Sequence, residues 1–246
     1  MKHSILLICS FWVSIAFSTP PSLDSLFVKA NSLYQQKEYE QAIDHYQSIL
    51  DADHASFELY YNLANSYFQF GKIPSSILYY EKALTLDRHN KHCLSNLKLA
   101  QSRITLIESM PTLFYVRWWN TISSTLSSQS WSILTIIALW IFSTLCVLFI
   151  NKRSRWLFYS LLFFAFISIN LFVLMNHSKK MEQDHYGVIM KHSKLFLDSQ
   201  LSNSVFTVKS GNKALLKDSL NNRVRVFLPD GQTGWIEKNH IARIKN

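Results

Sequence analysis

The sequence predicts a multidomain membrane protein that combines an all-α repeat array, a two-helix transmembrane hairpin and a small all-β barrel. Three observations lead to this fold class. Residues 23–90 repeat internally with a period of about 34 residues, which is typical of stacked helical hairpins. Residues 131–150 and 156–175 carry no charged side chain and have membrane-spanning length. Short alternating segments and four of the five glycines lie in residues 183–246, as expected of a strand-rich domain.

Charge and cysteine content limit the classes of function. The net charge is +9, yet residues 19–110 hold 8 basic and 10 acidic side chains, whereas residues 176–246 hold 12 basic and 6 acidic ones. The basic excess therefore belongs to the C-terminal part, where anionic lipid headgroups or wall polymers suit it as well as phosphate backbones do. We predict no nucleic-acid partner. The three cysteines, Cys9, Cys93 and Cys146, are too scattered for a disulfide framework or a CxxC metal site.

Residues 1–18 have the pattern of a secretory signal peptide. Lys2 precedes an apolar run over residues 5–17, and Ala16 and Ser18 place small residues just before the expected cleavage site. The alternative is an uncleaved N-terminal anchor, because the prolines at 20 and 21 crowd that site. In either case we expect the following segment to be exported.

The internal period predicts two helical hairpins, residues 23–56 and 57–90, and a capping helix over residues 91–108. Small residues at positions 8 and 20 of each repeat let its two helices approach closely, and large residues at positions 4, 11 and 24 fill the space beside them. In the second repeat these residues are Ala64, Ser76, Tyr60, Tyr67 and Tyr80. The pattern resembles the tetratricopeptide (TPR) repeat. Lys29 departs from it at position 7, as do His54 and Arg88, which replace the usual proline at position 32.

The TPR resemblance implies a partner-binding groove along the first helix of each repeat. Its concave-facing positions carry mostly aromatic and polar side chains here: Asp24, Phe27, Asn31, Tyr34, Glu58, Tyr61, Asn65 and Phe68. Aromatic rings with interspersed amides suit an extended peptide or a helix, so we expect a protein partner in this groove. The alternative is that the aromatics pack between repeats, which fits Asn31 and Asn65 less well because amides are poor core fillers.

One class of TPR ligand is disfavoured. Some TPR proteins hold a C-terminal carboxylate with a clamp of Lys and Arg side chains, but Phe27, His92 and Asn96 occupy clamp positions here. The resemblance therefore does not imply recognition of a free chain end.

Residues 131–150 and 156–175 are predicted to form a transmembrane hairpin. Each stretch has 20 residues and covers about 30 Å as a helix, the thickness of a hydrocarbon core. The loop over residues 151–155 contains three basic side chains, which assign it to the cytoplasm and both flanks to the outside. Neither stretch holds an Asp, Glu, Lys, Arg or His side chain, so an ion or proton pathway is not expected. Asn170 either pairs the helices or has no role. Residues 109–130 are predicted to be a linker containing Phe114, Trp118 and Trp119.

The C-terminal residues predict a small β domain over residues 183–246. Six strand-like segments are expected: 186–190, 194–197, 205–208, 214–216, 223–228 and 233–236. Pro229, Asp230 and Gly231 predict a tight turn, and Gly234-Trp235-Ile236 follows it in a way that resembles the bacterial SH3-like (SH3b) domain. Trp235 is then a core or rim residue, or else a stacking platform. Arg223 and Arg225 share the outer face, as a solvated edge or as a contact for a polyanion or peptide.

The order of these parts resembles the BatE-like proteins of the Bacteroides aerotolerance operon type. That resemblance implies a two-pass protein of the bacterial cytoplasmic (inner) membrane with both domains on the periplasmic side. It further implies a scaffold that works beside von Willebrand-type membrane proteins and a MoxR-class cytoplasmic ATPase.

Catalysis is not predicted. The sequence has no Gly-x-Ser-x-Gly elbow, phosphate-binding Gly loop or HExxH helix. His89, His92 and Cys93 lie close together but lack a second ligand group, which favours a solvated helix face over a metal site. We expect no cofactor. The leading function is a protein-interaction scaffold; the alternative is binding of peptidoglycan or another envelope polymer by the basic SH3-like domain, and an unrecognised enzyme is the third class.

Overall fold

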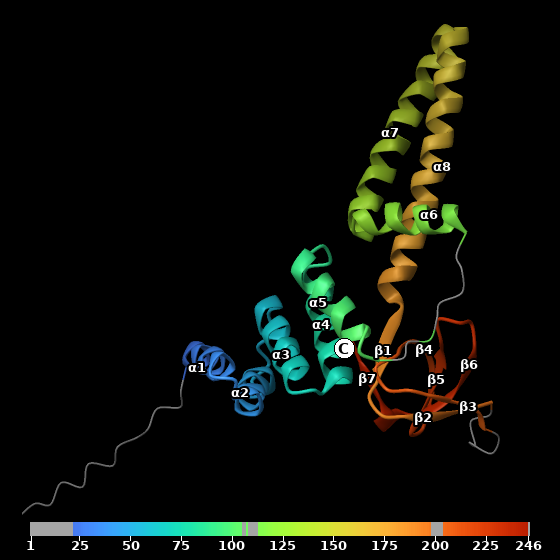
Figure 1. Cartoon of the computed structure of the whole chain (residues 1–246). Helices are drawn as coiled ribbons and strands as arrows, with labels where there is room; N and C mark the ends of the chain where they lie inside the picture. The colour runs from blue at the N-terminus through green and yellow to red at the C-terminus, as the bar shows by residue number, and fades with distance from the viewer. Residues whose placement is uncertain (1–21, 105–106, 108–112, 198–203, 246) are drawn as a thin grey trace, which may run out of the picture.

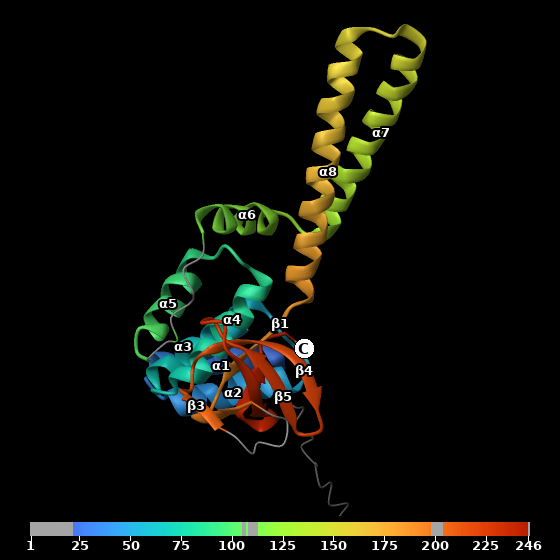
Figure 2. The same ribbon diagram turned by 90° about the vertical axis from the view of Figure 1, so that its right-hand side faces the viewer.

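A computed structural model describes residues 22–104, 107, 113–197 and 204–245 (Figure 1). The predicted signal peptide, residues 1–18, lies outside the described residues. A helical array and a β-sheet lie at one end of a long helical hairpin, and a short helix crosses the base of that hairpin (Figures 1 and 2). The helical array, the two long apolar helices and the C-terminal sheet are the three parts that the sequence predicts.

The array contains five helices: α1 (Leu23–Gln35), α2 (Tyr39–Asp51), α3 (Phe57–Gln69), α4 (Ile73–Leu86) and α5 (Lys91–Gln101). The helices α1, α3 and α5 begin at N-caps that recur with the repeat period, namely Ser22, Ser56 and Asn90. Each cap side chain accepts a hydrogen bond from the N–H three residues later, at 3.1–3.2 Å. Since such caps satisfy otherwise unpaired donors of the first turn, the repeat is encoded in its helix starts as well as in its core.

The core of the array follows the pattern of small and large residues. The small residues at repeat positions 8 and 20, which are Ala30, Ala42, Ala64 and Ser76, are all fully buried. Their size lets the helices of each hairpin approach closely, and the rings of Tyr46 and Tyr80 fill the space beside them. The predicted packing of the repeats is confirmed.

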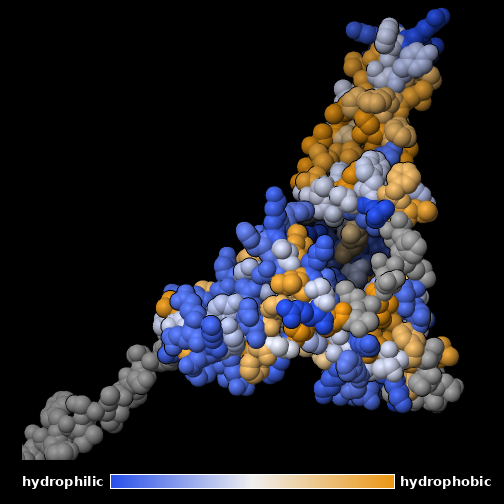
Figure 3. Space-filling model, in the orientation of Figure 1, coloured by the Kyte–Doolittle hydropathy of each residue, from blue (hydrophilic) through white to orange (hydrophobic). Residues whose placement is uncertain are grey.

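Two long apolar helices, α7 (Ser128–Lys152) and α8 (Arg155–Gln183), pack against each other as a hairpin. Both are long and apolar enough to cross a membrane. In each helix, only 11% of the most apolar 18-residue segment is buried. Large apolar side chains therefore cover the outside of the hairpin (Figure 3). Arg153 takes a left-handed conformation at the C-terminus of α7, which turns the chain into α8.

Residues predicted as a linker contain a helix, α6 (Phe114–Thr125). Six of its twelve residues are Phe, Tyr, Trp, Val or Ile, and serines and threonines occupy its last turn. Its apolar pattern extends over only three turns, which explains why the sequence predicts a linker here.

The C-terminal residues form one seven-stranded antiparallel sheet in the order β3-β2-β6-β5-β4-β1-β7. Its strands are β1 (His185–Ile189), β2 (Ser193–Phe196), β3 (Ser204–Val208), β4 (Lys213–Leu220), β5 (Arg223–Phe227), β6 (Thr233–Glu237) and β7 (Ile241–Arg243), with a 3-10 turn, η1 (Lys238–His240), before the last. The strands β3 and β7 are the two edges, so backbone pairing does not close the sheet into a barrel. The SH3-like assignment stays a prediction.

Strand β5 shows the alternation that the sequence predicts for its half-buried face. Val224 and Val226 are buried while Arg225 and Phe227 are exposed. The predicted turn after β5 is present, with Gly231 at φ 88° and its N–H donating to the carbonyl oxygen of Leu228 at 3.0 Å. Glycine adopts a positive φ without the steric cost that a side chain brings, so this residue fixes the reversal of the chain.

The array and the sheet share one hydrophobic core. Val188 of β1 and Ile244 after β7 are buried in the same cluster as Ile77, Tyr80 and Leu97 of the array. The Nζ atom of Lys213 in β4 lies 2.6 Å from the Oε2 atom of Glu81 in α4. The backbone N–H of Ile107 donates to the Oδ1 atom of Asn212 at 2.7 Å. The sequence alone gives no sign that these two parts pack together.

Candidate functional site

The groove predicted along α1 and α3 contains a hydrogen-bonded set of polar side chains. Asn31 lies in α1, and its Oδ1 atom accepts a hydrogen bond from the hydroxyl of Tyr46 in α2 at 2.5 Å. The same oxygen accepts a second bond from Nδ2 of Asn62 in α3 at 3.0 Å. The amide oxygen of Asn31 thus links α1 and α2, the two helices of the first repeat, to α3, the first helix of the second repeat.

The same arrangement recurs one repeat later. The Oδ1 atom of Asn65 in α3 accepts hydrogen bonds from the hydroxyl of Tyr80 in α4 at 2.5 Å and from Nδ2 of Asn96 in α5 at 3.1 Å. Nδ2 of Asn96 also donates to the hydroxyl oxygen of Tyr61 at 3.0 Å. We call these two sets the asparagine ladder. The ladder repeats with the same 34-residue period as the helices. It supplies hydrogen-bond partners to polar side chains that are partly withdrawn from water.

Tyr46 and Tyr80, the two tyrosines that donate to ladder oxygens, remain hydrogen-bond donors at neutral pH. Burial raises the pKa of Tyr46 to about 12, against an ordinary value of 10.0, and hydrogen bonding to Asn62 opposes that shift. Burial also raises the pKa of Tyr80, further than that of Tyr46. Desolvation disfavours the phenolate, so both phenols stay protonated and hold the amide oxygens in place.

A cavity of about 270 Å³ opens beside the ladder. We call it the groove cavity, and its lining residues are Asn31, Tyr34, Gln35, Tyr46, Asn62 and Asn65. All six are uncharged, and they present amide and phenol groups. Three of the predicted groove residues, Asn31, Tyr34 and Asn65, are therefore brought together here. Such a lining suits the main chain and uncharged side chains of a peptide rather than an ionic ligand.

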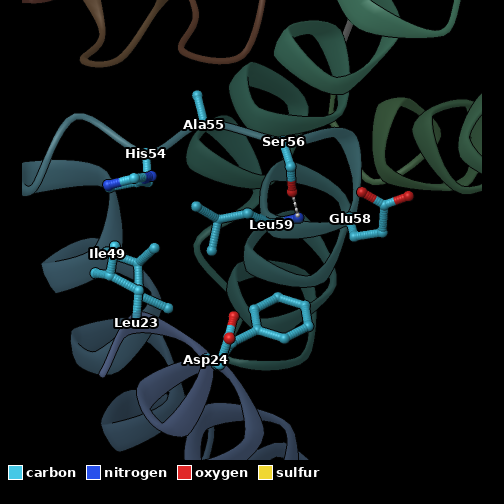
Figure 4. Close-up of a pocket in the computed structure, with 9 residues that line it drawn as sticks. Leu23, Asp24, Ile49, His54, Ala55, Ser56, Glu58 and Leu59 are labelled. Atoms are coloured by element: carbon cyan, nitrogen blue, oxygen red, sulfur yellow. Dashed lines mark hydrogen bonds between the residues drawn. The ribbon is translucent and has the colours of Figure 1, made fainter. Parts of the chain in front are cut away.

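A second cavity of about 340 Å³ lies between the two repeats (Figure 4). It is lined by Leu23, Asp24, Phe27, Ile49, His54, Ala55, Ser56, Glu58 and Leu59. Ser56 is held in place here because its hydroxyl caps α3 by accepting from the N–H of Leu59 (Figure 4). Asp24, Phe27 and Glu58, which the sequence places in the groove, line this cavity instead of the groove cavity. Its two carboxylates distinguish it from the neutral lining of the groove cavity.

The two remaining predicted groove residues are aromatic side chains packed within the array. The ring of Tyr61 lies 6.0 Å from that of Tyr80, which repeats the 5.8 Å edge contact of Phe27 with Tyr46. Phe68 packs against the core shared with the sheet.

Sequence reasoning missed the ladder residues Asn62 and Asn96. The signal is present, since these asparagines are themselves one repeat apart and follow the same period as Asn31 and Asn65. The structure places them on neighbouring helices, where they satisfy the oxygens of the predicted residues. Asn96 occupies a clamp position of other TPR proteins and serves here as a link between α3 and α5.

The outer face of the sheet carries the second predicted surface. Arg225 of β5 pairs directly with Trp235 of β6, and both point away from the buried Val224 and Ile236. The guanidinium of Arg225 lies 3.8 Å from the carboxylate of Asp218, and both side chains are largely exposed, so this pair contributes little stability. Arg223 lies two residues away on the same strand face.

Cys93 is a structural residue of α5. It is fully buried, and its Sγ atom lies 3.6 Å from the carbonyl oxygen of Tyr80. Burial raises the pKa of the thiol to about 12, so the reactive thiolate is scarce. The nearby His89 and His92 are exposed. Across the part of the chain that the structure describes, no three His, Cys, Asp or Glu side chains are grouped to hold a metal ion.

Comparison with known families identifies the repeats. Residues 30–71 match the TPR repeat family, and residues 57–90 match the tetratricopeptide repeat. The N-terminal array is built of TPR repeats. The second match coincides with the predicted second repeat, and TPR repeats are modules for protein–protein interaction that use extended concave surfaces. A search of curated proteins gives no match.

Proposed function

We propose that this protein is a non-catalytic, membrane-anchored scaffold that binds protein partners through its TPR groove. The observation that carries the proposal is the neutral groove cavity beside the asparagine ladder, within two matched TPR repeats. The ladder fixes the amide oxygens through internal bonds, which makes the groove a preformed surface for a peptide. A preformed groove loses little conformational entropy when it binds.

The hairpin supports the membrane anchor. Only 11% of the most apolar 18-residue segment of each long helix is buried. So large an exposed apolar surface is favourable in lipid and unfavourable in water. Both the array and the sheet lie at the same end of the hairpin, as a two-pass topology requires, and the three basic residues of the tight loop lie at the opposite end (Figure 1). We therefore place the loop in the cytoplasm and the two domains on the periplasmic side of the bacterial inner membrane.

The partners proposed from the resemblance to BatE-like proteins are von Willebrand-type membrane proteins in an envelope complex of the aerotolerance type. Membrane anchoring favours partners in the same membrane, because confinement to a surface raises the effective concentration of each protein.

The test changes the groove without changing the ladder. Gln35 lines the groove cavity, whereas its neighbour Gln36 does not. Gln35→Arg should abolish recovery of the membrane partner after crosslinking in native membranes and mass spectrometry, because a bulky charge enters the neutral groove. Gln36→Arg adds the same charge one residue away and should leave recovery unchanged. Equal recovery with both variants would place the interaction outside the groove.

The alternative function, binding of peptidoglycan or another envelope polymer, is supported by the direct pairing of Arg225 with Trp235 on the outer face of the sheet. A cation beside an aromatic ring suits a sugar polymer that carries carboxylates. Cosedimentation of the full chain in detergent with purified peptidoglycan should be lost in Arg225→Glu and retained in Lys238→Glu, which makes the same change of charge elsewhere. Retention in both variants would remove this alternative.

A further inference from the structure

Helix α6 lies crosswise at the base of the α7–α8 hairpin (Figures 1 and 2). Its C-terminal half is attached there by specific bonds. Oδ1 of Asn120 lies 2.9 Å from Nε2 of His177 in α8, and the carbonyl oxygen of Ser123 accepts from Nε1 of Trp131 in α7 at 3.2 Å. These contacts hold α6 at the level where the apolar part of α8 gives way to polar residues such as Lys179.

The opposite side of α6 carries exposed aromatic residues. Phe114 and Trp118 are one helical turn apart and are 78% and 61% exposed, and Tyr115 beside them is 54% exposed. Arg117 and Ser124, which are seven residues apart, lie on the adjoining polar side of the helix. A short helix with an aromatic side and a polar side, held parallel to a membrane surface, has the features of an interfacial helix.

We infer that α6 is an in-plane helix whose Phe114, Tyr115 and Trp118 insert into the headgroup region of a phospholipid leaflet. This inference rests on the proposed membrane anchor. Three observations favour lipid over a protein partner as the occupant of this surface. The hairpin that α6 contacts carries exposed large apolar side chains, among them Ile133 and Ile136 of α7, and a leaflet that covers these would also meet α6. Helix α6 lies at the level where the apolar segments of α7 and α8 end (Figure 1). Trp and Tyr are the residues that concentrate at membrane interfaces.

An interfacial α6 gives the molecule a second point of contact with the membrane. The hairpin alone leaves the array and sheet unrestrained about its axis, whereas a helix lying in the leaflet at its side resists both tilt and rotation. The basic groups Arg117, Lys179 and Lys180 lie on or near the same level and would attract anionic headgroups.

The test measures the depth of single spin labels in the full chain, reconstituted into vesicles of phosphatidylcholine and phosphatidylglycerol. In a background that lacks Cys9, Cys93 and Cys146, labels at 114 and 118 report on the aromatic side, and a label at 117 reports on the polar side. Labels at 114 and 118 should collide several-fold more with oxygen, relative to a water-soluble nickel complex, than the label at 117. A preference for nickel at all three positions would overturn the inference.

A label at 140 separates failure of this inference from failure of the membrane anchor. Trp140 lies in the middle of α7 and is 72% exposed. If this label prefers oxygen while those at 114 and 118 prefer nickel, the hairpin spans the bilayer and α6 stands clear of it. If the label at 140 also prefers nickel, the proposed anchor itself is wrong. Because all the labelled side chains are on the surface, circular dichroism should show unchanged helix content in every variant.

Discussion

The turn inside each TPR repeat requires one residue in the left-handed region. In the second repeat this residue is Gly71, with φ 84°, and in the first repeat Lys37 occupies the same position with φ 65°. A side chain crowds the backbone at positive φ, whereas glycine does not. The first repeat therefore holds a lysine where the second uses the residue that the turn favours.

Substitutions at Lys37 and Gly71 should change the free energy of unfolding in opposite directions. Lys37→Gly should raise the free energy of unfolding by about 0.5–1 kcal/mol, because it relieves the strained φ. Gly71→Ala should lower it by ~1 kcal/mol, and the loss is conformational, since no heavy atom within 4 Å would meet the new methyl group. Urea denaturation of the protein in detergent, followed by amide exchange in α1–α4, measures both. Destabilisation by Lys37→Gly would contradict this account of the turn.

Ser76 is a second residue that its repeat position explains. Its hydroxyl is buried without a hydrogen-bond partner among the described residues, while Ala42 occupies the same position in the first repeat. Ser76→Ala should raise the free energy of unfolding by about 1–2 kcal/mol, because an unsatisfied hydroxyl leaves the core. The reverse change, Ala42→Ser, is the matched control and should cost a similar amount in the same denaturation assay. No gain from Ser76→Ala together with no loss from Ala42→Ser would mean that the array tolerates the hydroxyl.

At the scale of the element, the asparagine ladder links helices that would otherwise touch only through apolar side chains. Asn96 is the end of the ladder and the polar attachment of α5 to α3, through its bonds to Asn65 and Tyr61. Asn96→Ala should lower stability by ~1–2 kcal/mol, because two hydrogen bonds are lost and the half-buried amide oxygen of Asn65 keeps only one partner. Amide exchange should become faster in α5 than in α1 and α2. Uniform acceleration throughout the array would show that the ladder acts globally instead.

The ladder also makes the array sensitive to alkali. Below pH 10.0 the phenols are protonated in both the folded and the unfolded chain. Between pH 10.0 and about 12, Tyr46 ionises only when the chain unfolds, so unfolding releases protons and stability falls as pH rises. The slope reaches ~1.4 kcal/mol per pH unit for each fully buried phenol. Urea midpoints across this range should fall less steeply in Tyr46→Phe, and an equal slope would assign the effect to other groups.

The elements that the sequence predicts are those with a strong internal pattern. Small residues at two repeat positions set the helices of the array, and 20 uncharged residues set each long helix. The helix α6 and the strand β7 lack such a pattern, because one is amphipathic over only three turns and the other has three residues. The asparagine ladder was not predicted, for a different reason. Asn31 and Asn65 follow the repeat period, but their hydrogen-bond partners depend on which helices become neighbours.

At the scale of the whole molecule, the packing of the sheet on the array is the feature that the sequence does not predict. Long-range contacts of this kind depend on surface shape, and the residues involved look like ordinary core residues of two separate domains. Gly211 illustrates this, since a Cβ atom at its position would collide with the Cδ1 atom of Ile104. A glycine that seems to serve only a turn thus also permits close approach between the two parts.

A shared core predicts that the array and the sheet unfold together. Ile244 is buried among residues of α4 and α5, while Ile236 is buried within the sheet's own core. Either isoleucine changed to alanine should cost ~2–4 kcal/mol, because each leaves a cavity. The two changes differ in where amide exchange becomes faster. Ile244→Ala should accelerate exchange in α4 and α5 as well as in β1 and β7, since it removes contacts from both sides.

Ile236→Ala is the matched control for this coupling and should act first on β5 and β6. If Ile244→Ala leaves amide exchange in α4 and α5 unchanged, the sheet contacts the array without belonging to the same cooperative unit, and the two parts unfold separately. Coupled unfolding would instead mean that a partner bound in the groove stabilises the sheet as well, because ligand binding stabilises every segment that belongs to the same cooperative unit. Occupancy of the groove would then be detectable as slower exchange in β1 and β7, far from the bound partner.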